Sequence, residues 1–77
     1  MRLVIDLRSP VPSYQQLAGQ LRAAIESGEV EPGAQLPSIT SLVQETGLAV
    51  NTVRHALQVL ADENVIVTVP GRGSYAI

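Results

Sequence analysis

The strongest structural signal in this chain lies in residues 51–64, NTVRHALQVLADEN. Apolar side chains recur there at the spacing of one helix face (i, i+3, i+4 and i+7), at Val53, Ala56, Leu57 and Leu60. The other faces of this helix carry polar side chains, at Asn51, Arg54, His55 and Gln58. Asn64 can end the helix, because asparagine adopts the left-handed conformation more readily than most residues. The fold must therefore bury one face of this helix and leave the other faces free.

An earlier helix is predicted at residues 13–28, SYQQLAGQLRAAIESG. Ser13 is expected to be its N-cap, with Gln16 completing a capping box, and Gly28 is expected to stop it. Its apolar face comprises Tyr14, Leu17, Ala18, Leu21 and Ile25. Pro32-Gly33 then suits a type II turn, because proline fixes the first central position and glycine tolerates positive φ at the second.

A short helix is predicted between these two, at residues 38–47, SITSLVQETG. Ser38 follows a proline and is expected to cap the helix, and Gly47 is expected to end it. Its inner face comprises Ile39, Leu42 and Val43. The LAV sequence that follows leaves room for only a tight turn before the next helix, so a helix-turn-helix unit is predicted.

A β-hairpin is predicted at the end of the chain. Residues 65–69 (VIVTV) and 74–77 (SYAI) are rich in β-branched or aromatic side chains, and PGRG between them is typical of a turn. A helix-turn-helix is how a recognition helix is placed in the major groove of DNA. A plain helical hairpin fits the two helices nearly as well, and the β-hairpin favours the first interpretation because it can act as a wing. The predicted fold is α+β, a winged helix-turn-helix of three helices followed by a β-hairpin wing.

Length and composition allow one small domain of 77 residues. Residues 1–10 are expected to form an N-terminal arm or a short edge strand, with residues 3–6 as the extended part, and residues 11–77 are expected to form the domain. The apolar fraction of 45% is sufficient for a core, and the chain has no cysteine for a disulfide or a thiolate metal site. Five arginines, no lysine and seven acidic residues give a net charge of −2, which argues against broad, charge-driven binding of nucleic acid.

Several motifs together resemble the winged helix-turn-helix domain of GntR-type bacterial transcription regulators. They are YQQL at the start of the first helix, GEVEPGAQLPS before the second, TVRHALQVL in the third, and GRG in the wing. Each motif is weak alone, but their order and spacing over residues 11–77 are specific. The resemblance implies binding of double-stranded DNA through the start of the second helix, the first turns of the third helix and the wing tip.

The chain keeps some of the family's contact residues and lacks others. The retained matches are Ser38, Thr52, Arg54, Gly71, Arg72 and Gly73. The family usually has an arginine where this chain has Thr40, a Ser-Arg pair where it has Ala49-Val50, and basic residues where it has residues 67–69, VTV. The resemblance therefore implies the fold and the binding mode, while the missing arginines lower the expected affinity for DNA.

The third helix carries most of the candidate DNA-binding residues. Arg54 can bind a phosphate or a guanine edge with its planar guanidinium, and Asn51 and Gln58 can make paired hydrogen bonds to adenine. Thr52 can donate to a phosphate, and His55 is expected to be exposed, either on the groove side or elsewhere on the surface. An alternative interpretation of Arg54 is an ordinary solvated side chain, paired with an acidic neighbour such as Asp62 or Glu45.

The second helix and the wing supply the remaining candidates. Ser38 and Thr40 lie at a helix N-terminus, where free backbone N–H groups favour a phosphate. Arg72 lies between Gly71 and Gly73, so the loop can approach a DNA backbone or a narrow minor groove closely. A polar turn residue without a ligand is an equally good interpretation of Arg72.

Two other function classes are compatible with the sequence. A protein-interaction module on the same fold is favoured by the negative net charge, the missing arginines and three valines, Val50, Val67 and Val69. A small architectural or recombination DNA-binding protein is the second alternative. No nucleophile–base pair stands out, and PGRGS lacks the lysine of a phosphate-binding loop, so no enzymatic activity is expected.

The expected partners follow from the same observations. The chain is expected to bind double-stranded DNA, as a homodimer on a palindromic site, and to carry no small-molecule effector domain. No metal is expected because His55 is the only histidine, and no cofactor is expected. No apolar run is long enough to cross a bilayer, and the N-terminal residues make a poor signal peptide, so a cytoplasmic location without membrane contact is expected.

Overall fold

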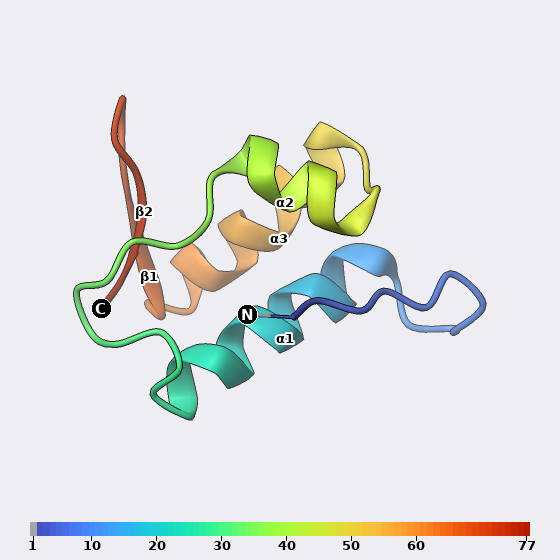
Figure 1. The fold of residues 1–77 in the computed structure, drawn as a ribbon, viewed down its shortest axis with the longest axis horizontal. Coiled ribbons are helices and arrows are strands. Elements are labelled where there is room, and N and C mark those ends of the chain that lie inside the picture. The colour runs from blue at the N-terminus through green and yellow to red at the C-terminus, as the bar shows by residue number, and fades with distance from the viewer. Residues whose placement is uncertain (1) are drawn as a thin grey trace.

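Three helices followed by a β-hairpin form in the order that the sequence predicts, and the α+β winged helix-turn-helix is confirmed (Figure 1). The computed structural model describes residues 2–77, so residue 1 of the expected arm lies outside the described residues. The elements are α1 Ser13–Glu26, α2 Ile39–Thr46, α3 Val50–Asp62, β1 Ile66–Val69 and β2 Gly73–Ala76. Within this part of the chain, no helix is both long enough and apolar enough to cross a membrane.

The core forms around α3, which packs against α1, α2 and β1. The large side chains that are almost completely buried are Leu17, Leu21, Leu42, Val53, Leu60 and Ile66. All except Ile66 lie on the helix faces that periodicity predicts, whereas Ile25 on the predicted face of α1 is only partly buried. Loop residues complete the core, with Val30, Leu36 and Leu48 at most 9% exposed.

The start of α1 differs from the predicted capping box. The N-cap is Pro12, which has no side-chain cap, and Ser13 is the first helical residue. Pro12 has the non-helical backbone angles of an N-cap, with φ of −55° and ψ of 145°. The helix therefore begins one residue earlier than predicted, and Ser13 lies inside it instead of capping it. The Gln16 side chain does not reach back to a cap, because it binds the N-terminal arm instead.

Residues 2–6 form no strand and run along α1 as an arm (Figure 1). The Gln16 amide accepts from the Asp6 N–H and donates to the Asp6 carbonyl, both at 2.8 Å. One helical turn later, the Gln20 amide binds the Val4 N–H and carbonyl in the same way. Two residues of extended chain advance about 6.6 Å and four residues of helix about 6 Å, so the two glutamines match alternate residues of the arm.

The helix-turn-helix has one predicted side-chain cap and one uncapped start. The Ser38 hydroxyl accepts from the Ser41 N–H at 3.1 Å, and Gly47 ends α2 with φ of 73°, as predicted. α3 begins at Val50, with Ala49 as an N-cap that has no side-chain hydrogen bond, so Asn51 lies inside the helix. After α3, Asn64 has φ of 61°, which confirms the predicted left-handed stop.

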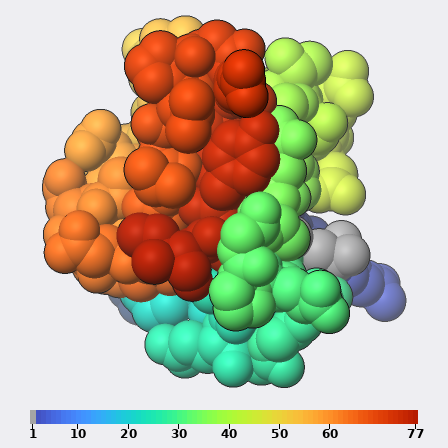
Figure 2. All heavy atoms as spheres, turned by 90° about the vertical axis from the view of Figure 1, so that its left-hand side faces the viewer, coloured from blue at the N-terminus to red at the C-terminus, as the bar shows by residue number. Residues whose placement is uncertain are grey.

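The linker before α2 pairs with the hairpin, which the sequence patterns did not predict. The Leu36 N–H donates to the Ser74 carbonyl at 2.8 Å, and the Ala76 N–H donates to the Ala34 carbonyl at 2.9 Å. These bonds flank an antiparallel bridge between Gln35 and Tyr75. Figure 2 shows the green linker lying against the red C-terminal strand. The C-terminal strand of the wing is therefore paired on one side with β1 and on the other with the linker before α2.

Candidate nucleic-acid interface

The start of α3 presents free backbone donors. The first hydrogen bond of the helix joins the Val53 N–H to the Ala49 carbonyl at 3.1 Å. The preceding N–H groups, of residues 50–52, have no acceptor inside the helix. Asn51 is exposed and Thr52 half-buried in this first turn. Free N–H groups and polar side chains at a helix N-terminus form a suitable site for a phosphate.

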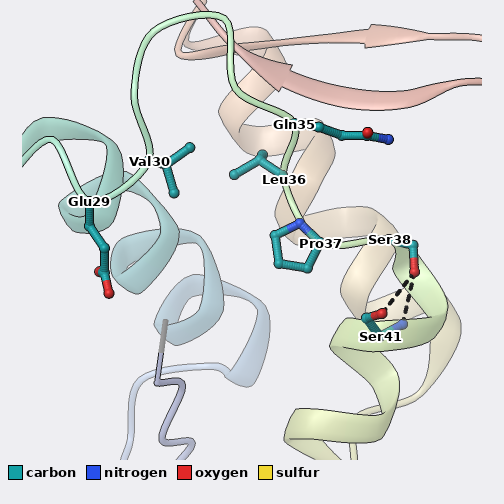
Figure 3. Close-up of a pocket in the computed structure, with 7 residues that line it drawn as sticks. All are labelled: Glu29, Val30, Gln35, Leu36, Pro37, Ser38 and Ser41. Atoms are coloured by element: carbon teal, nitrogen blue, oxygen red, sulfur yellow. Dashed lines mark hydrogen bonds between the residues drawn. The ribbon is translucent and has the colours of Figure 1, made fainter.

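The start of α2 lies beside an open pocket of about 590 Å³, which the linker and α2 line together. Figure 3 shows Ser38 and Ser41 facing each other, with the Ser38 hydroxyl accepting from the Ser41 N–H and donating to the Ser41 hydroxyl. The Ser38 hydroxyl is therefore engaged within the helix cap. Thr40 is exposed in the first turn of α2, where its hydroxyl can reach an external acceptor.

Arg54 and Gln58 lie at a groove of about 240 Å³ between the helix-turn-helix and the hairpin. Its lining comes from α2, α3 and both strands, namely Ile39, Arg54, Leu57, Gln58, Thr68 and Ser74. Gln58 donates to the Asp62 carboxylate at 2.9 Å, one turn further along α3. Among the described residues, Arg54 makes no ion pair, so neither Asp62 nor Glu45 neutralises it.

His55 lies on the side of α3 that faces α1. Its imidazole stacks on the Tyr14 ring, with centroids 3.8 Å apart and planes 13° from parallel. His55 is still exposed, as expected, but it is turned about 100° around the helix from Arg54. The structure thus brings Arg54 and Gln58 together at the hairpin groove and places His55 away from them.

Arg72 sits in the tight turn of the wing. Its N–H donates to the Val69 carbonyl at 3.0 Å, and Gly71 has φ of 77°, so Pro70-Gly71 form the centre of a type II turn. The Arg72 carbonyl accepts from the Gln35 side-chain amide at 2.8 Å. Both main-chain polar groups of Arg72 are therefore engaged, while its exposed side chain has no ion pair within residues 2–77.

One arginine, Arg22, is already paired with an acidic side chain. Arg22 of α1 makes two hydrogen bonds of 2.8 Å to the Glu63 carboxylate at the end of α3. This pair ties the two helices together on the exterior of the molecule, so Arg22 is not free for a ligand. The described residues also contain no group of three or more His, Asp or Glu side chains that could hold a metal ion.

Comparison with known proteins identifies the family to which the three helices and the hairpin belong. The family model described as "Bacterial regulatory proteins, gntR family" matches residues 13–75, which include all three helices and nearly all of the hairpin. The chain belongs to the GntR family. The transcriptional repressor NagR of Bacillus subtilis is 37% identical over 71 residues, which are 92% of this chain and 29% of NagR. The repressor YtrA of Bacillus subtilis is 38% identical over 71 residues, covering 55% of YtrA. This GntR chain thus spans less than two thirds of these curated relatives.

Solved structures share the fold of this GntR domain. YtrA from Sulfolobus acidocaldarius, a GntR-family transcription factor, superposes with a TM-score of 0.90 at 39% identity, over 99% of this chain and 80% of that one. The DNA-binding domain of AraR, solved in complex with operator ORX1, gives a TM-score of 0.90 over 100% of this chain and 99% of that one. At 23% identity, the AraR likeness shows the fold alone.

The departures from the family pattern lie at the surface of this GntR domain. Thr40 and Val50 are exposed at the starts of α2 and α3, and Val67 is exposed on β1. Thr40, Val50 and Val67 therefore belong to α2, α3 and the hairpin, the same three elements that line the groove at Arg54. Sequence reasoning missed Gln35 and the Tyr14–His55 stack, because both contacts join segments that are distant in the chain.

Proposed function

We propose that this domain binds double-stranded DNA sequence-specifically as the DNA-binding part of a transcription regulator. In this proposal α3 enters the major groove, and the wing contacts the adjacent backbone or minor groove. The observation that carries it is the groove shared by α2, α3 and the hairpin, where Arg54 lies without an ion pair to any residue of 2–77. Two exposed arginines, Arg54 and Arg72, then come from the two elements that the winged fold directs at DNA.

Each proposed contact follows from the chemistry of the residue. Arg54 would bind a guanine edge or a phosphate, and Asn51 would read an adenine or meet the backbone beside it. Gln58 donates one N–H to Asp62, and its Oε1 and second N–H stay available for a base. Arg72 would bind the backbone or a narrow minor groove at the wing. The AraR domain was solved in complex with its operators, and we carry that mode of docking to this chain as part of the proposal.

We also propose that two copies bind a palindromic site together. Few free cations are available in one domain, and log affinity changes with log salt by about 0.9 for each phosphate neutralised, so one domain alone binds weakly. Two domains on half-sites about 34–36 Å apart would double the contacts. Sedimentation of the protein with duplexes holding one or two half-sites tests this, because a 1:1 complex on the longer duplex would contradict it.

The direct test of DNA binding is an NMR titration of the 15N-labelled domain with duplex DNA at several salt concentrations. We expect amide shifts at the start of α2, along the first turns of α3 and at residues 70–73. With Arg54 and Arg72 as the contacting cations, the slope of log affinity against log salt should be shallow, about −1 if only Arg72 binds a phosphate and about −2 if both do. Absence of binding at low salt, or shifts centred on the outer face of α1, would refute the proposed docking.

A second candidate function is a protein-interaction module on the same scaffold. The observation that favours it is the exposure of two valines at the interface, Val50 at 45% and Val67 at 47%. The net charge of −2 also favours it, since a negative domain is repelled by DNA at long range. This function would become the better explanation if the titration shows no binding of duplex DNA.

A further inference from the structure

We propose that Gln35, in the linker before α2, is a positioning residue that fixes the wing tip for DNA contact. This inference rests on the proposed function and adds to it a residue outside the helix-turn-helix and the wing. Its side-chain Nε2 donates to the Arg72 carbonyl at 2.8 Å. That contact joins positions 37 residues apart in sequence, from the linker to the turn at the tip of the hairpin.

The linker backbone determines where the Gln35 side chain lies. Hydrogen bonds from Leu36 to Ser74 and from Ala76 to Ala34 place Gln35 opposite Tyr75 in an antiparallel bridge. Flanked in this way, Gln35 and Tyr75 are a non-hydrogen-bonded pair, whose backbones approach most closely. In Figure 3 the Gln35 side chain points away from Val30 and runs beside the hairpin strands. Its amide is thus carried alongside the hairpin as far as the turn.

The turn itself fits this contact. The Arg72 N–H is bound to Val69 within the turn, and the Arg72 carbonyl is bound to Gln35 from outside it. The next residue is glycine, and a Cβ at Gly73 would lie only 2.9 Å from the Gln35 Nε2. A side chain at that position would displace the amide, so the glycine makes room for the contact. Gln35 and Gly73 therefore act as one unit that holds the peptide on the C-terminal side of Arg72.

This arrangement orders the main chain of Arg72 and leaves its side chain free. A two-stranded hairpin is marginally stable alone, so the tip of a wing is mobile unless another segment holds it. Ordering the tip before binding reduces the conformational entropy lost when Arg72 meets DNA. Gln35 would then raise affinity without touching DNA, and its effect would depend on the presence of the Arg72 side chain.

The first part of the test needs no DNA. We compare 15N relaxation of the unaltered domain, of Gln35→Met, and of Gln15→Met as a control. Methionine is similar in length to glutamine and neutral, and it lacks the amide donor. In Gln35→Met the backbone order parameters of residues 71–73 should fall from about 0.85 towards 0.6, while the amides of Leu36 and Ala76 stay ordered. Gln15 is exposed on α1, which carries none of the proposed DNA contacts, so its variant should leave the wing unchanged.

The second part is a double-variant cycle on duplex affinity with Gln35→Met and Arg72→Ala. Gln35→Met should weaken binding about five-fold when Arg72 is present, the ratio that corresponds to the net contribution of one hydrogen bond. In the Arg72→Ala background it should have no effect. Equal losses in both backgrounds, or an unchanged order of the wing in Gln35→Met, would overturn the positioning role. If the unaltered domain does not bind duplex DNA, the proposed function fails, and the relaxation data alone then decide whether Gln35 orders the wing.

Discussion

Replacing Arg54 and Arg72 together by alanine tests the proposed interface most directly. Both side chains are exposed, and among the described residues neither is part of an ion pair. Surface changes of this kind alter the free energy of unfolding by less than about 0.5 kcal/mol. The melting temperature should therefore remain close to that of the unaltered domain, and any loss of binding can be assigned to lost contacts with DNA.

The size of the loss depends on what each arginine contacts. An arginine that binds a guanine edge contributes about 1–3 kcal/mol, which is about a 5- to 160-fold change in affinity. An arginine that binds only a phosphate changes the slope of log affinity against log salt by about 0.9. Arg54, at the groove beside α3, is expected to follow the first pattern, and Arg72, at the wing tip, the second.

The assay is fluorescence anisotropy with a labelled duplex at several salt concentrations, with circular dichroism melting as the check on folding. Arg22→Ala is the control for each single arginine variant, because it removes the same single charge from a side chain that is bound to Glu63. An exposed pair of this kind contributes about 0–1 kcal/mol to stability, so the control should fold and should bind DNA normally. The reasoning is refuted if the double variant binds as well as the unaltered domain. It is also refuted if Arg22→Ala weakens binding as much as either single variant, Arg54→Ala or Arg72→Ala, since only net charge would then matter.

The remaining predictions concern single sites. Asn51→Ala should keep or slightly raise the melting temperature, because Asn51 lies inside α3 and alanine favours the helix more than asparagine does. Its affinity for duplex DNA should fall. A lower melting temperature would contradict the placement of Asn51 inside the helix. Ser38→Ala should cost about 1 kcal/mol in chemical denaturation through loss of the α2 cap, and Ser38→Asn should retain it. Gly73→Ala should destabilise the fold by about 1 kcal/mol or more, since its φ is 119° and the new Cβ would meet Gln35. Gly19→Ala, in open space on α1, should instead stabilise it by about 0.5–1 kcal/mol. Thermal melts that move the melting temperature in the same direction for both variants would refute the comparison.

Local signals in the sequence were sufficient for most of the fold. The apolar spacing of α3 predicts which face is buried, and Gly47 and Asn64 end their helices in the left-handed conformation as expected. Such features depend on a few neighbouring residues, whose φ and ψ preferences act in any context. The start of α1 was mispredicted because two adjacent residues can serve as N-cap, and Pro12 satisfied the required dihedral angles before Ser13.

Contacts between distant segments could not be predicted in the same way. The linker around Gln35 alternates over only three residues, 34–36, between Gly33 and Pro37, which is too short to predict a strand, and it pairs with β2 because the packed helices bring the two together. The Tyr14–His55 stack and the Arg22–Glu63 pair likewise join α1 to α3 through side chains that sequence spacing does not relate. The candidate DNA-binding residues were chosen from motifs, and their roles remain predictions until binding is measured.

The pairing of the linker with β2 also has a kinetic consequence. It joins residues 33–36 to residues 74–76, and so closes into one loop the whole segment that carries the proposed DNA contacts. A contact of such long sequence separation forms only after the entropy of closing the loop has been overcome, which slows folding. During synthesis the loop cannot close until the last strand has left the ribosome. The pairing of the linker with β2 would therefore form no earlier than the hairpin itself.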